Sequence, residues 1–158
     1  MKTLLIALVL TGFLFVLTSC SDFLERKPTP EEIVGKWEVA WVAPSVKEWL
    51  ANNDIHQLPP KAGIEFHADG TFTATSLPYT LDHSMDKCRV INRNGRWKLI
   101  DSTADDDLVK WGIQVMPADV NVVCLFDFHE DSQGIYLDNP VDWENQNSVV
   151  MRRGKKPN

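Results

Sequence analysis

Apolar and polar residues alternate in short runs along most of the chain. In Trp37–Trp41 every second residue is aromatic or branched, as a half-buried strand requires. The alternation is most regular in Val109–Val115 and continues in Val120–Phe128. Asp69-Gly70 lies between two further runs, and an Asp-Gly pair in that position is typical of a type I′ hairpin turn. The pattern predicts about eight short strands joined by turns.

Two segments depart from the strand pattern and predict short helices. Thr29 and Glu32 have the spacing of a capping box, with Pro30 at the first helical position. Ser45–Asn52 carries its apolar residues on one side. Many short strands with one or two short helices are typical of an all-β protein, and we expect a small antiparallel β-barrel. Eight strands enclose a space that side chains fill or that holds one small ligand.

The first 19 residues have the features of a secretion signal. Lys2 precedes an almost unbroken apolar run from Leu4 to Leu17, and small residues then precede Cys20. A membrane-spanning helix is the alternative, but it needs about 20 apolar residues and this run is shorter.

The stretch Leu17-Thr18-Ser19-Cys20 resembles the lipobox of bacterial lipoproteins. The resemblance implies cleavage before Cys20, a diacylglycerol on its thiol and an acyl group, such as palmitate, on its new amine. Several acyl chains together anchor a protein stably to a membrane. Ser21 after the lipidated cysteine favours the outer membrane, with the protein facing the periplasm.

The chain divides into a signal peptide (1–19), a lipidated tether (20–29), a barrel domain (30–153) and a basic tail (154–158). The 158 residues carry a formal net charge of -6. A mildly acidic domain argues against nucleic acid, which needs a basic footprint. The basic residues at the C-terminus predict a solvated tail, with a lipid-headgroup contact as the alternative.

Two cysteines remain once Cys20 is lipidated. Cys88 and Cys124 would lie in an oxidising compartment, where an even pair suggests a disulfide. Closing a loop of about 36 residues would contribute roughly 3–4 kcal/mol in the chain-entropy model. The alternative is two separate buried thiols.

Three short motifs resemble the lipocalin superfamily, and more specifically the small lipocalin-like domains of bacterial lipoproteins. They are Gly35-Lys36-Trp37, Asp69-Gly70-Thr71-Phe72 and Gly95-Arg96-Trp97. The resemblance covers residues 30–153, although a Thr-Asp-Tyr motif and a C-terminal helix are missing from the sequence. It implies that Gly35 bends the chain into the barrel and that Trp37 closes one end. Either Arg152 or Arg153 would then pack over Trp37 by a cation–π contact.

Aromatic residues are the candidate ligand contacts. The alternation places Trp41, Trp97 and Trp111 on inward faces, together with Phe66 and Phe126. They predict an aromatic-lined pocket, since ligand pockets are mostly apolar with few polar groups. The alternative is that these rings simply fill the barrel.

Catalytic signatures are missing from the sequence. It holds no nucleophile elbow, phosphate loop or dinucleotide fingerprint, and its four histidines have no metal-ligand spacing. We therefore expect neither an enzyme nor a bound metal or cofactor. The first hypothesis is a membrane-anchored periplasmic lipoprotein that binds a small hydrophobic or amphipathic ligand. The alternative is a protein-interaction or inhibitor module of the cell envelope that uses the loops Pro44–Pro60 and Leu77–Asn94, with a filled barrel.

Overall fold

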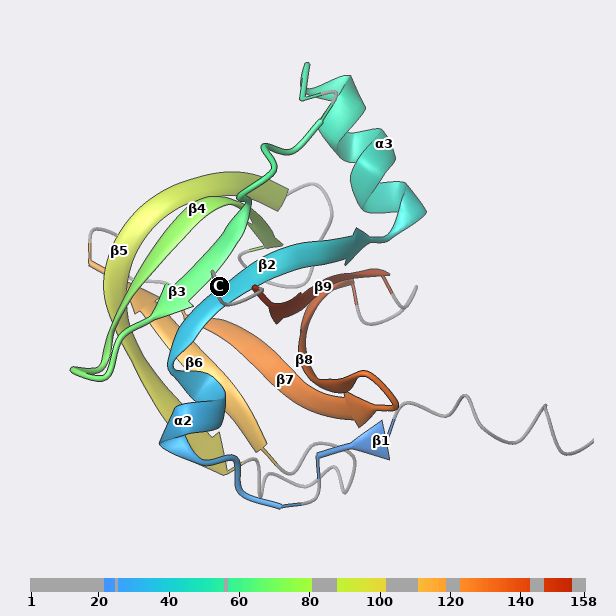
Figure 1. Ribbon diagram of the computed structural model, residues 1–158. Helices are drawn as coiled ribbons and strands as arrows, with labels where there is room; N and C mark the ends of the chain where they lie inside the picture. Colours follow the sequence, from blue (N-terminus) through green and yellow to red (C-terminus); the bar gives the residue numbers. More distant parts are fainter. Residues whose placement is uncertain are drawn as a thin grey trace, which may run out of the picture.

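Eight antiparallel strands form a closed barrel (Figure 1). The computed structural model describes residues 22–24, 26–55, 57–80, 88–101, 111–118, 123–142 and 147–154. The barrel strands are β2 (Gly35–Val42), β3 (Gly63–Phe66), β4 (Thr71–Thr80), β5 (Cys88–Asp101), β6 (Trp111–Pro117), β7 (Cys124–Asp131), β8 (Gly134–Asp142) and β9 (Asn147–Arg153). Each strand pairs with the next, and β9 pairs with β2 to close the ring. The predicted fold class is confirmed. The predicted signal peptide, Cys20 and residues 155–158 lie outside the described residues.

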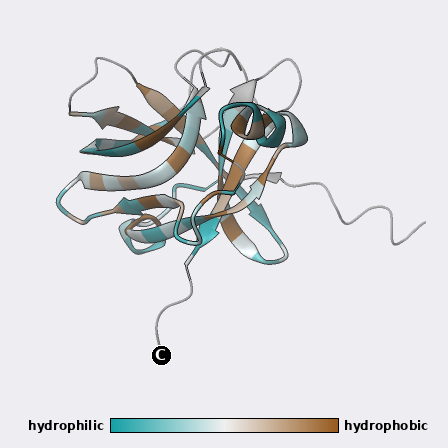
Figure 2. Ribbon diagram, turned by 90° about the horizontal axis from the view of Figure 1, so that it is seen from above, coloured by the Kyte–Doolittle hydropathy of each residue, from teal (hydrophilic) through white to brown (hydrophobic). Residues whose placement is uncertain are grey.

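The interior of the barrel is packed with large apolar side chains. Strand positions alternate between hydrophobic and hydrophilic (Figure 2), and the inward rows meet in one core. Its largest fully buried members include Trp37, Phe66, Phe72, Phe126 and Phe128. Near the helix α3 (Pro44–Asn52), two opposite walls of the barrel touch, because the side-chain amide of Asn139 on β8 donates a hydrogen bond to the Pro78 carbonyl on β4. Side chains therefore fill the middle of the barrel.

Trp37 closes the end of the barrel next to α2 (Pro30–Ile33). Its ring is 0% exposed, and its indole N–H donates to the Ile33 carbonyl at 2.8 Å. The Arg153 guanidinium lies 5.4 Å from the centre of the Trp37 ring and donates to the carbonyls of Val34 and Glu31. Arg153, and not Arg152, is thus the arginine that covers Trp37.

Gly35 and Arg152 complete this closed end. Gly35 has φ of 120°, and a Cβ there would lie 2.5 Å from a guanidinium nitrogen of Arg153, so the position requires glycine. Arg152 instead lies over the Tyr136 ring at 4.9 Å and forms an ion pair with Asp131 at 2.5 Å.

The Asp69-Gly70 hairpin forms, but with a different turn from the one predicted. The last ladder pair is Phe66↔Phe72, and the His67 amide donates to the Thr71 carbonyl. Gly70 has φ of 81°, whereas Asp69 is not among the residues of positive φ. A type I′ turn needs both, so this is the longer loop with glycine alone in the left-handed region.

The N-terminal segment packs onto the barrel from Asp22 onward. β1 (Asp22–Phe23) pairs with the end of β7, and the Leu24 amide donates to the Phe128 carbonyl at 3.0 Å. Leu24 is 2% exposed and belongs to the core, and Pro28 is buried. Much of the segment predicted as a tether is therefore part of the folded barrel.

The predicted second helix is present as α3 (Pro44–Asn52), which packs across the opposite end of the barrel. It ends in a Schellman motif, in which the Ile55 amide donates to the Leu50 carbonyl and the Asp54 amide to the Ala51 carbonyl. Asp54 occupies the left-handed position with φ of 61°. This ending directs Ile55 back beside Leu50.

We expect Asp54→Gly to stabilise the protein by about 0.5–1 kcal/mol, because glycine adopts the left-handed conformation without a Cβ penalty. Urea unfolding measures the change. Asn53→Gly is the matched control, since Asn53 has φ of -107° and gains nothing from glycine. Equal effects of the two substitutions would contradict the assignment of the motif.

Candidate ligand-binding cleft

Four of the five aromatic residues predicted to bind a ligand gather in the barrel core, and Trp41 lies apart from them. Phe66 and Phe126 are both 0% exposed and belong to the core. Trp97 meets Phe66 edge-on at 5.5 Å between ring centres, and Trp111 is partly buried. Trp41 lies on the outside of the barrel. The predicted inward facing is therefore wrong for Trp41, whereas Phe66 and Phe126 face inward as predicted and fill the barrel, which was the alternative to a pocket.

A β-bulge explains why Trp41 points outward. The β2–β9 register runs from Val39↔Met151 to Trp41↔Val150, so Ala40 is an extra residue on β2. One inserted residue reverses the facing of every residue after it. Val42 consequently points inward and is buried, whereas Trp41 is 46% exposed.

Trp41 lines a cleft of about 390 Å³ between β2 and the chain that connects α3 to β3. The cleft forms because β3 pairs with only the first half of β2, up to Glu38↔Gly63. One further hydrogen bond joins the Val39 amide to the Ala62 carbonyl, and the connecting chain then leaves the strand. The lining residues are Val39, Ala40, Trp41, Val42, Lys47, Leu50, Ile55, Gln57, Leu58, Pro59 and Ala62.

The lining of this cleft combines apolar walls with two polar groups. Nine of the eleven lining residues are apolar, and the exceptions are Lys47 and Gln57. Its volume lies within the usual range of small-molecule sites, which are mostly apolar with few polar groups. The arrangement suits a hydrocarbon chain whose polar or anionic head meets Lys47. No sequence motif marks this site, because it depends on the bulge at Ala40 and on where β3 begins.

A second cleft of about 490 Å³ lies at the closed end, and three of its charged side chains, Glu32, Arg152 and Arg153, form contacts within the fold. The arginine side chains of Arg152 and Arg153 cover Tyr136 and Trp37, as described above. Glu32 forms a bidentate pair with Arg26, and the hydrogen bonds from Arg26 and from the Thr29 amide lower its pKa to about 2. This cleft is therefore built around contacts that hold the fold together.

Two buried carboxyl groups face each other across β7 and β8. Asp127 and Asp138 are direct register partners, and Asp127 is 8% exposed. Burial, with the nearby Asp138 charge, raises the pKa of Asp127 to about 7, and burial also raises the pKa of Asp138. Burial lowers the pKa of the neighbouring His129. Burial therefore disfavours the charged form of each group, and the alternation pattern, which assigns polar residues to solvent, did not single them out.

Cys124 carries a free thiol, so the predicted disulfide with Cys88 is not formed. Cys124 pairs with Val115, which pairs with Trp97, nine residues after Cys88 on β5. That is about 30 Å along the path of the strand, whereas disulfide-bonded Cα atoms lie within about 7 Å. Burial raises the pKa of the Cys124 thiol to about 12. The cysteine is thus an unreactive core residue.

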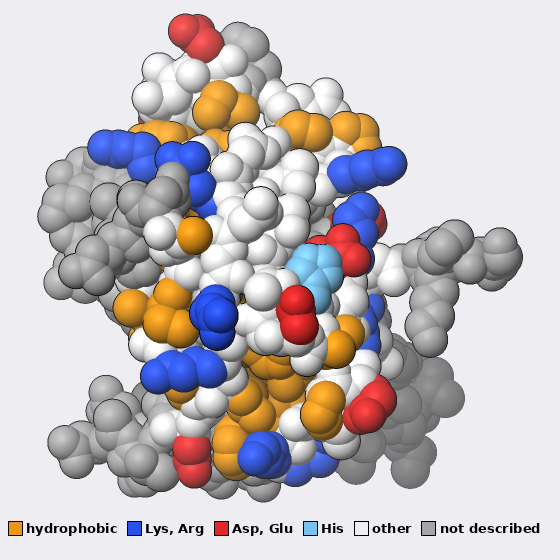
Figure 3. Space-filling model, turned by 90° about the vertical axis from the view of Figure 1, so that its left-hand side faces the viewer, with side chains coloured by type: hydrophobic (Ala, Val, Ile, Leu, Met, Phe, Trp, Pro, Cys, Tyr) orange, Lys and Arg blue, Asp and Glu red, His pale blue; other side chains and the backbone are white. Residues whose placement is uncertain are grey.

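The barrel face formed by β3, β4 and β5 differs from the cleft in chemistry. Basic side chains there are interspersed with acidic and apolar ones (Figure 3).

Among the described residues, no group of three His, Cys, Asp or Glu is arranged to hold a metal ion. The described part of the chain also contains no helix with the length and apolarity needed to cross a membrane.

Comparison with protein-family models, with curated proteins and with solved structures finds no match to this chain.

Proposed function

We propose that this protein is a lipid-anchored barrel of the bacterial envelope, facing the periplasm, that binds a small amphipathic ligand in the cleft beside β2. The observation that carries the proposal is the apolar cleft with Trp41 exposed on its wall and Lys47 among its lining residues. The lipobox-like stretch before Cys20 supports the anchor. The lipocalin-like motifs agree with a barrel that binds ligands, but the proposed site lies outside the barrel core.

The favoured ligand is a medium-length hydrocarbon chain with a carboxylate head. Trp41, Leu58 and Ile55 offer apolar surface to the chain, and Lys47 offers a cation to the head. Burial of apolar area contributes about 25 cal/mol per Å², so the hydrocarbon chain supplies most of the favourable free energy that offsets the entropy cost of association. The exposed ion pair adds less, roughly 0.2–1 kcal/mol.

Decanoate titrated into the unacylated Cys20→Ala protein tests this site by calorimetry. We expect Trp41→Ala to weaken binding about tenfold, because aromatic anchors dominate such contacts. Val123→Ala is the matched control, since Val123 is 45% exposed and does not line the cleft. Equal losses in the two variants, or no binding of decanoate at all, would exclude the cleft as the ligand site.

Substitution of Lys47 tests recognition of the head group separately from that of the hydrocarbon chain. We expect Lys47→Met to weaken decanoate two- to fivefold, roughly the worth of an exposed ion pair, and to leave decanol unaffected. Lys98→Met on β5 serves as the control for loss of a surface charge, since Lys98 is exposed and lies outside the cleft. If decanol weakens as much as decanoate, Lys47 does not recognise the head group.

A second candidate function is the protein-interaction or inhibitor module. The filled core favours it, because a barrel packed with side chains has no need of an internal ligand. Leu50 is buried in the apolar cluster beneath α3, and Trp49 packs against that cluster. Trp41, which is 46% exposed, is therefore the described aromatic residue most available to a partner. A stoichiometric envelope protein whose capture is lost in Trp41→Ala, with no decanoate binding, would favour this function over the first.

A further inference from the structure

We infer that the anchored barrel stands with its closed end, formed by α2, β1 and the β7–β8 turn, against the bilayer surface, and that the cleft beside β2 opens at the opposite end. This inference rests on the acylation of Cys20 in the proposed function. It adds the orientation of the protein and the side from which its ligand arrives.

Chain length places the anchor at the closed end. Asp22 pairs with Glu130 at the end of β7, next to the turn that leads into β8. Cys20 precedes Asp22 by two residues, so their Cα atoms can lie at most about 7 Å apart. The lipidated residue must therefore lie beside this turn, whatever its conformation. A tether of nine free residues, as the sequence suggested, would reach roughly 30 Å and leave the orientation open.

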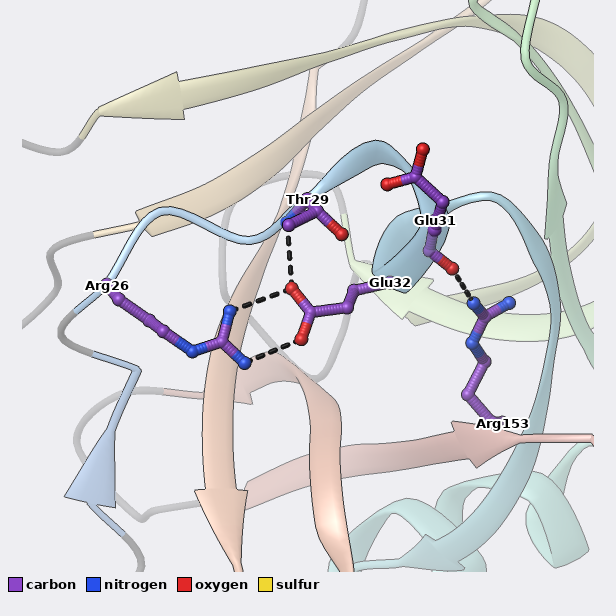
Figure 4. Close-up of polar contacts among 5 residues, drawn as sticks. All are labelled: Arg26, Thr29, Glu31, Glu32 and Arg153. Atoms are coloured by element: carbon purple, nitrogen blue, oxygen red, sulfur yellow. Dashed lines mark hydrogen bonds and ion pairs between the residues drawn. The ribbon is translucent and has the colours of Figure 1, made fainter.

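The chain after Asp22 is braced against α2, and α2 is joined to the barrel where Arg153 of β9 donates to the Glu31 carbonyl (Figure 4). Leu24 is buried in the core and its amide bonds to the Phe128 carbonyl. The Arg26 guanidinium donates two hydrogen bonds to the Glu32 carboxylate, at 2.8 and 2.5 Å. The same carboxylate accepts a hydrogen bond from the Thr29 amide at 2.8 Å. Residues 22–24 and 26–32 therefore form a short attachment that ties the position of the anchor to that of the barrel.

The surface at the closed end suits a layer of lipid headgroups. Arg26 and Lys27 are exposed there, as are Glu31 and Glu130. These four described side chains carry two charges of each sign, so together they add no net repulsion from a zwitterionic surface. Binding strength comes from the acyl chains and not from a polybasic patch, which would need several unpaired cations.

The cleft lies toward the opposite end of the barrel, beside the second half of β2. β2 starts beside α2 and leads after eight residues into α3 (Figure 1). Eight strand residues span about 26 Å. The cleft, which is lined by the second half of β2 and by α3, is thus held away from the headgroups. Its ligand arrives from the aqueous side, as a dispersed amphipath, and is not drawn directly from the bilayer beneath.

Fluorescence quenching of the lipidated protein in phosphatidylcholine vesicles tests the orientation. A bimane label is placed at Gln133→Cys in the β7–β8 turn or at Asn52→Cys at the end of α3, both exposed positions, with Cys88→Ser and Cys124→Ala as background. Nitroxide-headgroup lipid should quench the label at 133 about threefold more than the label at 52, because the barrel length separates them. Equal quenching, or stronger quenching at 52, would overturn the orientation.

A flexible insertion serves as the matched control. Ten Gly and Ser residues between Ser21 and Asp22 restore a tether of about 30 Å while leaving the barrel and the anchor intact. We expect quenching at the two positions to become equal in this variant. If the difference persists, the barrel surface and not the short attachment sets the orientation, which would contradict the inference.

Vesicle flotation separates this inference from the proposed anchor. The lipidated protein should float with the vesicles and Cys20→Ala should not. Failure of the unaltered chain to float overturns the anchor and this inference with it. Equal quenching in a chain that floats overturns the orientation alone.

Discussion

Trp37→Ala should destabilise the protein by about 3–5 kcal/mol, the usual cost of emptying a buried tryptophan site. The ring is 0% exposed, meets Phe128 edge-on at 6.4 Å and donates to the Ile33 carbonyl at 2.8 Å. Removing it also leaves Arg153 without the ring beneath its guanidinium. Because small domains are stable by about 5–15 kcal/mol in total, much of the protein should unfold at moderate urea concentrations.

Urea unfolding followed by far-ultraviolet circular dichroism measures this loss, and Trp41→Ala is the matched control. Trp41 lies on the same strand but is 46% exposed, so we expect a change below about 1 kcal/mol. Trp37→Phe should recover part of the loss, since it keeps an aromatic ring but not the indole N–H. Similar losses for Trp37→Ala and Trp41→Ala would show that Trp37 does not close the barrel.

The contrast between these two tryptophans shows how far alternation predicts the fold. Trp37 and Val39 lie on the inward row as the two-residue period requires, and so do the hairpin residues Phe66 and Phe72. The period fails at Trp41 because Ala40 is an extra residue against β9. This bulge depends on pairing with a strand more than 100 residues away, so the local sequence pattern does not predict it. The candidate cleft could not be predicted for the same reason.

A second irregularity, in β4, likewise changes which residues face inward. The β4–β5 register slips between Ala74↔Arg93 and Leu77↔Ile91. Ser76 adopts φ of 46° there, and its amide donates to the side chain of Asn92. This slip points Leu77 inward, where strict alternation from Phe72 would have placed Ser76.

The two-residue strand β1 and the separation of Cys88 from Cys124 also could not be predicted from the sequence. β1 has only two residues, too few for any period, so the folded start of the chain read as a free tether. The cysteine count suggested a disulfide, but strand order separates Cys124 from Cys88. Compartment and count can suggest a disulfide, whereas register decides whether the two Cα atoms approach.

Stability should fall as the pH rises from about 4 to about 7, because of the buried Asp127. Its pKa is about 7 in the folded protein and near 3.8 when unfolded, so within this window the folded state holds a proton that the unfolded state has lost. Stability is then highest below pH 4 for this group, decreases through the window and is constant above pH 7. Asp138 directly opposite acts in the same direction, since its pKa is also raised.

Asp127→Asn should remove the Asp127 part of this dependence and leave that of Asp138, because an amide has nearly the shape of the carboxylic acid and does not ionise. We expect the variant to be more stable than the natural chain above pH 7, by about 2–4 kcal/mol, and to differ little near pH 4. Urea midpoints measured from pH 4 to pH 8 report the difference. A constant offset across that range would mean that Asp127 is ionised in the folded barrel.

Asp131 on the same strand provides a control of opposite sign. Its pKa is lowered by hydrogen bonds from Arg152 and from the Gln133 amide, so its contribution to stability is present at neutral pH and is lost as the pH falls. Asp131→Asn should therefore destabilise the protein at pH 7 and lose that effect in acid. Asp127→Asn should instead stabilise the protein above pH 7 and also lose its effect in acid. Two aspartates four residues apart then separate the effect of burial from that of an arginine partner.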